Sequence, residues 1–158
     1  MKNIITRLFF VCTLFLAQLS SAEDLASEQA TQGIDHIGLS VSNLDASTNF
    51  FIDALGFKVV GRDSKYPAAF LNDGNMSLTL WQTGDESVPF NRKQNVGLHH
   101  LAIKVTSFEA LDSLYETVKT MPGVVIEFSP ELAYGGPAKH MMIREPSGNR
   151  LEFVHRPK

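Results

Sequence analysis

Apolar and polar residues alternate in two stretches of the chain, residues 35–41 and 99–105. The apolar positions of these stretches are Ile37, Leu39, Val41, Leu101, Ile103 and Val105. Such alternation is typical of a β-strand that buries one face in the core. The opposite face begins with His36 in the first stretch and with His100 in the second, 64 residues later. The two histidines therefore occupy the same register of two similar strands.

A segment with apolar residues at helical spacing follows each of these strands. In the first segment Asn43 or Asp45 can cap a helix that runs to about Leu55 and ends at the following glycine. In the second segment Ser107 can cap a helix that runs to about Thr120, before a Pro-Gly pair. In both halves, a predicted strand is thus followed by a predicted helix of similar length.

Three short strands are predicted after each helix. They cover residues 57–61, 68–71 and 77–82 in the first half, and residues 124–128, 139–144 and 150–155 in the second. Both halves therefore have the order β-α-β-β-β, and a repeat of this length is a structural module. The pattern predicts one α+β domain over residues 34–158, made of modules at about residues 34–84 and 97–156.

The first 22 residues have the three parts of a secretory signal. Lys2 and Arg7 precede an apolar run at residues 8–17, and small residues at positions 20 and 22 mark a cleavage site before Glu23. The apolar run is too short for a permanent membrane helix, so we expect no stable membrane anchor. The sequence predicts export across the inner membrane to the periplasm, with residues 23–33 as a flexible leader.

The composition is that of an ordinary globular domain. The 158 residues are 44% hydrophobic and 20% charged, with a formal net charge of −3, which excludes a disordered, collagen-like or disulfide-framework protein. No basic surface for nucleic acid is expected. Loss of residues 1–22 removes two basic residues and no acid, which changes the net charge to −5, and it removes Cys12, the one cysteine. Imidazole and carboxylate groups are then the plausible strong metal ligands.

One carboxylate is predicted on the same side of the sheets as the two histidines. In the last strand Leu151 and Phe153 share the apolar face, so Glu152 points to the opposite face with His36 and His100. Two histidines and one carboxylate are a recognised ligand set for a divalent metal, and they leave coordination positions open. We therefore predict a metal site at these three residues, which would bind a small-molecule substrate.

Further side chains are expected around this site. Three of them share the inward face of the strand at 77–82 and are predicted to line the substrate cavity: Ser77, Thr79 and Trp81. Trp81 can equally fill space at the end of the sheet. His140 lies on the strand beside Glu152, where it is either a general acid or base or, as the pattern favours, an exposed polar residue. Lys104 and Arg144 are expected at the rim, where either can steer an anionic substrate.

Four phrases of the sequence resemble the vicinal oxygen chelate superfamily: DHIGLSV, NFFIDALGFKVV, LHHLAIKV and REPSGNRLEFV. This superfamily includes the glyoxalase, bleomycin-resistance, fosfomycin-resistance, methylmalonyl-CoA epimerase and extradiol dioxygenase families. The resemblance covers about residues 33–156. It implies paired βαβββ modules that form a curved mixed sheet around a metal-containing cavity, with His36, His100 and Glu152 as the metal ligands.

The resemblance also implies a choice among reactions. Glyoxalase I-type enzymes have a carboxylate ligand where this chain has Thr79, whereas a His, His, Glu set is that of extradiol dioxygenases and fosfomycin-resistance transferases. Extradiol dioxygenases also have an acid–base tyrosine about ten residues before the glutamate ligand, and this chain has no tyrosine at that place, near Met142. We predict a homodimeric, ring-cleaving dioxygenase-like enzyme for a molecule with vicinal oxygens, with Fe(II) favoured over Mn, Zn or Ni. The alternatives are a glyoxalase I-like lyase or isomerase of lactoylglutathione lyase type, and a non-catalytic drug- or metabolite-binding protein of bleomycin-resistance type.

Overall fold

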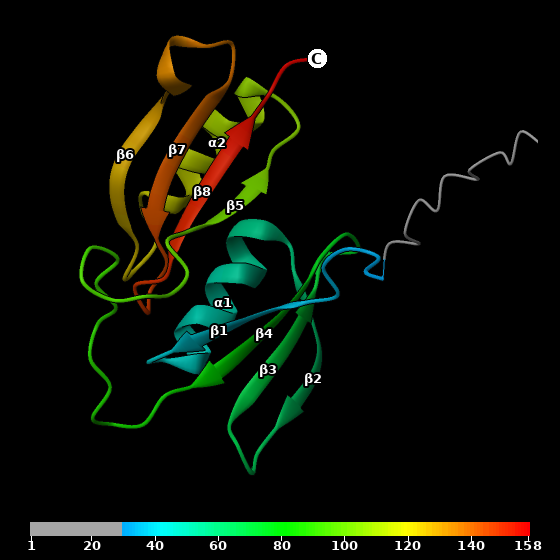
Figure 1. Ribbon diagram of the computed structural model, residues 1–158, viewed down its shortest axis with the longest axis vertical. Helices are drawn as coiled ribbons and strands as arrows, with labels where there is room; N and C mark the ends of the chain where they lie inside the picture. The colour runs from blue at the N-terminus through cyan, green and yellow to red at the C-terminus, as the bar shows by residue number, and fades with distance from the viewer. Residues whose placement is uncertain (1–29) are drawn as a thin grey trace, which may run out of the picture. The chain divides into compact units, whose positions relative to one another are not determined.

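The chain forms two βαβββ modules, as Figure 1 shows. The computed structural model describes residues 30–158, except the side chain of Tyr134, so the predicted secretory signal lies outside the described residues. Residues 1–33 and 34–158 separate as two units, and residues 30–33 contain no helix or strand. In residues 30–158, no helix combines the length and apolar character that a membrane span requires.

The elements of the two modules correspond one to one. Module one contains β1 (Ile37–Val41), α1 (Leu44–Leu55), β2 (Lys58–Asp63), β3 (Ala68–Asn72) and β4 (Ser77–Gln82). Module two contains β5 (Leu101–Lys104), α2 (Phe108–Val118), β6 (Val125–Leu132), a short 3₁₀ turn, β7 (Lys139–Arg144) and β8 (Arg150–His155). Strands β1 and β5 each begin one residue after the histidine of the predicted metal site, so His36 and His100 directly precede their strands.

Local sequence accounts for both helices. The side chain of Asn43 accepts a hydrogen bond of 2.9 Å from the backbone N–H of Ala46, which caps α1. Gly56 ends α1 in the left-handed conformation, with φ 73°, as its lack of a Cβ allows. Ser107 caps α2 by accepting from the N–H of Ala110, and α2 ends two residues before the predicted Thr120.

The strands form two separate four-stranded sheets with the same order. The order is β1-β4-β3-β2 in module one and β5-β8-β7-β6 in module two. The first and last strands of each module pair in parallel, and the other pairs are antiparallel. The expected α+β fold is confirmed, and the two mixed sheets do not close into a barrel. The register places Thr79 opposite Gly38 and Glu152 opposite Ala102, so these two residues are equivalent in the two modules.

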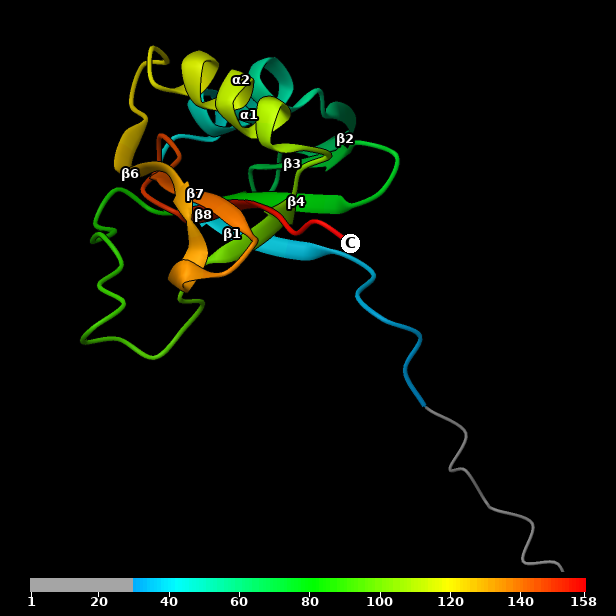
Figure 2. The same ribbon diagram turned by 90° about the horizontal axis from the view of Figure 1, so that it is seen from above.

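The main hydrophobic core of the described residues lies between the helices and the sheets. Figure 2 shows α1 and α2 next to each other on one side of the strands. The fully buried side chains of this core include Phe50, Phe51, Leu78, Leu80, Leu151 and Phe153. Because side chains alternate along a strand, the residues between these leucines and phenylalanines project away from the helices. Thr79 and Glu152 are therefore on the side that the helices leave open.

A buried carboxylate joins the two modules at the turn between β7 and β8. Glu145 is 1% exposed and accepts a hydrogen bond of 2.5 Å from the hydroxyl of Ser47 on α1. The hydroxyl of Ser147 in the same turn accepts from the backbone N–H of Asn43, and Asn149 donates to the carbonyl of Ser40. The turn of module two is thus fixed to the β1–α1 segment of module one.

Candidate functional site

Glu152 lies at the centre of a polar cluster on the second sheet. Its Oε1 atom is 2.6 Å from Nδ1 of His140, and its Oε2 atom is 3.1 Å from Nε2 of His100. We call these three residues the carboxylate cluster. His140 is buried, so the expectation that it is exposed is wrong. The reason is that β7 lies between β6 and β8, and the Phe128 ring is only 4.9 Å from the imidazole, measured between ring centroids.

Sheet register brings the two imidazoles to Glu152 from opposite directions. Glu152 lies between Ala102 of β5 and Met142 of β7. His100 precedes Ala102 by two residues on a parallel strand, and His140 precedes Met142 by two residues on an antiparallel strand. Side chains two residues apart share a face, so His100 approaches from the start of β8 and His140 from its end. The two oxygens of one carboxylate can therefore bind two different rings.

His99 orients the imidazole of His100. The two Nδ1 atoms are 2.8 Å apart, so one ring donates to the other through these atoms and the Nε2 atom of His100 is left to face Glu152. Partial desolvation, and then the positive charge of Arg150, lower the pKa of His99. This lower pKa favours a neutral His99 ring, which can accept the Nδ1 proton of His100.

The donor atoms of His100 and Glu152 suit two ligands of one divalent metal. Metal–nitrogen and metal–oxygen bonds of about 2.1 Å at a right angle place two ligand atoms about 3 Å apart. The separation between His100 Nε2 and Glu152 Oε2 is 3.1 Å. In residues 30–158, however, no three His, Cys, Asp or Glu side chains are arranged to hold a metal. Within this described part of one chain, His100 and Glu152 therefore fit part of a ligand set.

His36 is placed on the other sheet, at the start of β1. Its Nδ1 atom is 2.6 Å from the Asp35 carboxylate, and its side chain is 53% exposed. A carboxylate at Nδ1 fixes the proton there and leaves Nε2 as the ligand atom, which is the common arrangement behind metal-binding histidines. Of the three predicted ligands, the structure brings His100 and Glu152 together and does not join His36 to them.

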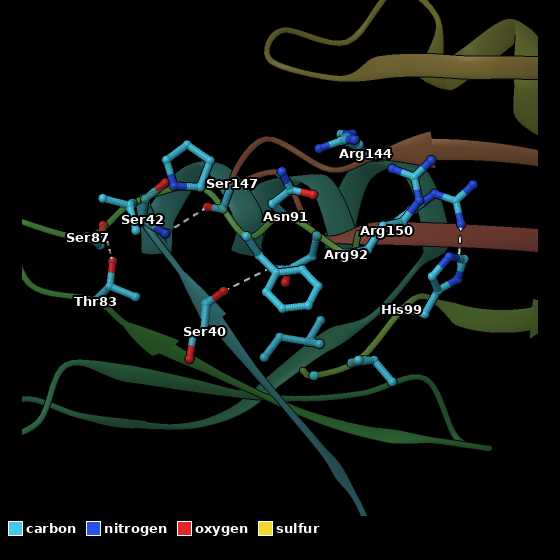
Figure 3. Close-up of a pocket in the computed structure, with 18 of the residues that line it drawn as sticks. Ser40, Ser42, Thr83, Ser87, Asn91, Arg92, His99, Arg144, Ser147 and Arg150 are labelled. Atoms are coloured by element: carbon cyan, nitrogen blue, oxygen red, sulfur yellow. Dashed lines mark hydrogen bonds between the residues drawn. The ribbon is translucent and has the colours of Figure 1, made fainter. Parts of the chain in front are cut away.

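A pocket of about 820 Å³ lies beside the carboxylate cluster. Its walls come from β1, the loop at residues 83–99 and the turn at residues 144–150. Figure 3 shows Arg92, Arg144, Arg150 and His99 at one end of the pocket and several hydroxyl side chains at the other. Of the two predicted rim residues, Arg144 lines this pocket and Lys104 does not. The pairing of Arg144 with Arg150 across a tight turn is the pattern that predicts a local concentration of positive charge.

The family model of the Glyoxalase/Bleomycin resistance protein/Dioxygenase superfamily matches residues 33–153. The protein belongs to this superfamily. The matched segment includes both histidines, Glu152 and the residues that line the pocket. The predicted resemblance is confirmed.

Solved structures show the same fold at low sequence identity. A glyoxylase/bleomycin resistance protein/dioxygenase domain from Frankia sp. EAN1pec has a TM-score of 0.68 and 21% identity, over 81% of this chain and 100% of that one. A lactoylglutathione lyase from Agrobacterium tumefaciens has a TM-score of 0.60 and 21% identity, over 80% and 95% of the two chains. A fosfomycin resistance protein from Listeria monocytogenes has a TM-score of 0.63 and 18% identity, over 78% and 90%. At these identities the likeness is one of fold.

The three predicted cavity residues lie on the first sheet of this superfamily fold, on the face away from the helices. The indole N–H of Trp81 donates to the Thr79 hydroxyl at 2.9 Å, and the Ser77 hydroxyl accepts from Asn72. The rings of Tyr66 and Phe70 contact Trp81, with centroids 5.1 and 5.8 Å away. Ser77, Thr79 and Trp81 do not line the pocket of 820 Å³. Their contact with substrate stays a prediction.

Proposed function

We propose that the protein is an exported divalent-metal enzyme that acts on a small molecule with vicinal oxygens, by a reaction of ring-cleaving dioxygenase type. One observation carries this proposal: the carboxylate of Glu152 lies between two imidazoles on the open face of the second sheet. Superfamily members typically use a divalent metal, which supports the assignment of His100 and Glu152 as ligands. When bound, the metal supplies Lewis acidity to two neighbouring substrate oxygens, and Fe(II), the favoured metal, also supplies redox chemistry.

The third ligand is His36 of a second copy of the chain. Its exposed side chain, with Nδ1 engaged by Asp35, presents Nε2 to a neighbour, while residues 30–158 of one chain bring no third metal ligand to His100 and Glu152. Both β1 and β5 are edge strands of their sheets, so two copies can approach along these edges. The proposal is therefore a homodimer with His36 from one copy and His100 and Glu152 from the other, which agrees with the frequent dimers of the superfamily.

In this proposal the role of His140 is to hold the carboxylate of Glu152 in position. Its bond to Oε1 holds the carboxylate so that Oε2 faces His100. The Phe128 ring of β6 packs against the imidazole of His140, with ring centroids 4.9 Å apart. His140 is thus a positioning residue in this proposal, and a substrate complex would test its predicted role as a general acid or base.

The position equivalent to Glu152 in module one favours three protein ligands over four. Thr79 occupies that position, and its hydroxyl is engaged by the indole of Trp81. A glyoxalase I-like lyase with a second carboxylate ligand at this place is therefore the weaker candidate. The binding-protein alternative is also weaker, because binding without catalysis does not require a carboxylate between two imidazoles.

Metal content tests the proposal directly. The purified protein is loaded anaerobically with Fe(II), Mn(II), Zn(II) or Ni(II), dialysed and analysed for metal. We expect about one metal per chain in the wild type, a strong loss in His100→Ala and Glu152→Gln, and no loss in His155→Ala, whose ring contacts a backbone carbonyl elsewhere. Wild-type content below about 0.2 per chain would reject a metalloenzyme.

Activity assays then separate the reactions. Oxygen uptake with a panel of catechols supports the dioxygenase reaction, and product from the hemithioacetal of methylglyoxal and glutathione would support the lyase instead. Metal binding and substrate binding without either turnover would indicate a binding protein. Export is tested separately by fractionation of the host cells, with the mature chain expected to begin at Glu23 in the periplasmic fraction.

A further inference from the structure

The charge of the pocket beside the carboxylate cluster differs from the charge of the whole chain. The chain has a formal net charge of −3. Among the described residues that line the pocket, three are arginines and none is Asp or Glu. A concave site lined by one sign of charge attracts ligands of the opposite sign. The positive lining is therefore a property of this pocket and not of the general composition.

One carboxylate, that of Glu127, contacts all three arginines but does not itself line the pocket. Glu127 Oε1 accepts from Nε of Arg144 at 2.8 Å, and Oε2 accepts from Nε of Arg150 at 2.6 Å. The guanidinium of Arg92 lies 3.8 Å from the same carboxylate. Among the described contacts, three positive charges thus share one negative charge. Glu127 holds the guanidinium groups in place while two positive charges remain for a ligand.

The hydrogen bonds to Glu127 use the Nε atoms of Arg144 and Arg150, so they leave the outer edge of each guanidinium, with its two terminal nitrogens, for other partners. The Arg150 side chain is only 14% exposed, and one terminal nitrogen is 3.4 Å from Nδ1 of His99. A planar guanidinium that is fixed in this way binds a carboxylate or phosphate group with two parallel hydrogen bonds. Partial burial strengthens such a pair, because water screens it less.

Arg150 connects the three arginines to the carboxylate cluster, because it lies on β8 with Glu152. Arg150 precedes Glu152 by two residues, so both side chains are on the same face and their Cα atoms are about 7 Å apart. Arg144 is paired with Arg150 in the neighbouring strand. One small molecule can therefore place vicinal oxygens at the cluster and a second polar group at the arginines.

We propose that Arg92, Arg144 and Arg150 form an oxyanion subsite, and that the substrate carries a carboxylate or phosphate group besides its vicinal oxygens. The assignment of this group to the substrate rests on the function proposed above, whereas oxyanion binding in the pocket does not. The pocket of about 820 Å³ is of the size that proteins use for small-molecule ligands.

Binding of simple probes to the metal-free protein tests the subsite. Benzoate carries a carboxylate on a phenyl ring, and phenyl phosphate carries a phosphate on the same kind of ring. Benzyl alcohol is the neutral control. By calorimetry at low salt we expect saturable binding of at least one oxyanion and much weaker binding of benzyl alcohol. Added NaCl should weaken the oxyanion binding. A preference for benzoate assigns a carboxylate substrate, and a preference for phenyl phosphate assigns a phosphate substrate.

Matched arginine variants identify the residues. Arg92→Gln changes a loop residue that contacts Glu127 only at 3.8 Å, so the fold should persist, as circular dichroism would verify. We expect this variant to bind the oxyanion about tenfold more weakly, equivalent to about 1.4 kcal/mol. Arg144→Gln provides the second measurement. Arg62→Gln is the control, because it removes the same positive charge from β2 of the first sheet, outside the pocket.

Two results would overturn the subsite. Either the wild type shows no saturable oxyanion binding, or Arg92→Gln and Arg144→Gln bind as Arg62→Gln does, in which case the arginines only stabilise the fold around Glu127. Metal content measured on the same preparations keeps the two proposals apart. A protein that loads metal but binds no oxyanion rejects the subsite alone, and one that binds oxyanion but no metal rejects the metalloenzyme alone.

Discussion

Ser47 on α1 donates a hydrogen bond of 2.5 Å to Glu145, which lies 98 positions later in the turn between β7 and β8. Glu145 is 1% exposed and also accepts from the backbone N–H and the side-chain amide of Asn149. A buried carboxylate is tolerated only when such hydrogen bonds replace its water. The packing of the two modules therefore depends on the hydrogen bonds that this buried carboxylate accepts.

Replacement of Ser47 by alanine should destabilise the protein. The variant leaves a buried carboxylate without one charge-assisted donor, and we expect a loss of about 1.5–3 kcal/mol in the free energy of unfolding. Urea denaturation measures this loss. Ser113→Ala is the matched control, since Ser113 is exposed on α2 and should change stability by less than about 0.5 kcal/mol. Equal effects of the two substitutions would show that the contact with Glu145 contributes nothing.

The ion pairs of Glu127 should make stability depend on acid pH. Burial raises the pKa of Glu127, but hydrogen bonds from Arg150 and Arg144 outweigh it, so its pKa lies below the ordinary value of 4.5. A carboxyl group with a depressed pKa in the folded state stabilises the fold above its unfolded pKa, and this contribution is lost as pH falls through the folded pKa. The free energy of unfolding should therefore decrease from about pH 4.5 downward.

Glu127→Gln removes this titration. The variant should be less stable than the wild type at pH 7, and the difference between the two should shrink as the pH is lowered below 4.5. Glu116→Gln is the control, because Glu116 pairs with Lys119 on the exposed surface of α2. A constant difference between wild type and Glu127→Gln at every pH would contradict the assignment.

Gly56 should be sensitive to the smallest possible side chain. Its φ of 73° lies in the left-handed region, and a Cβ there would meet no atom within 4 Å. Gly56→Ala should therefore cost about 1 kcal/mol through backbone strain alone. Gly84→Ala is the matched control, since its added Cβ also meets open space but its backbone is not in the left-handed region. Thermal denaturation of both variants compares the two effects, and equal midpoints would contradict the role of Gly56.

Local signals made the elements predictable from the sequence. The sequence offered Asn43 or Asp45 as the cap of α1, and the structure has Asn43; capping by Ser107 and alternation in β4 predicted the start of α2 and the bounds of that strand correctly. Strand β6 was predicted to end at Phe128 but continues to Leu132. The pairing register of β6 with β7 shifts twice along this stretch, so the alternation that marks a regular strand is interrupted.

Contacts between distant segments were not predictable from the sequence. The partner of Glu145 is 98 residues away, so the sequence showed only a turn at this place. His140 is buried because a neighbouring strand and Phe128 cover it, which alternation within one strand does not reveal. The loop at residues 83–99 carries no periodic pattern, yet it places Arg92 in the pocket. The sequence likewise put His36, His100 and Glu152 on equivalent faces without fixing whether one chain joins them.

A mixed dimer decides whether the metal site is shared between two chains. In the proposed homodimer each site takes His36 from one copy and His100 from the other, so His36→Ala and His100→Ala each destroy both sites of their own dimers. Co-expression of the two variants with different tags allows the heterodimer to be purified. One of its sites then combines the intact His36 of one chain with the intact His100 of the other. We expect about half of the wild-type metal content in this heterodimer and almost none in either parent.

A metal site within one chain predicts a different metal content for the heterodimer. If one chain supplied all three ligands, each chain of the heterodimer would lack one of them, and the metal content would stay at the level of the parents. The control is a heterodimer of His100→Ala with Glu152→Gln, whose changes affect the same carboxylate cluster. In the shared site, His100 and Glu152 come from the same chain, so this pair cannot restore an intact site and should bind no more metal than its parents. Restoration in both mixtures would contradict the shared site, because only the first exchange combines residues from two different sheets.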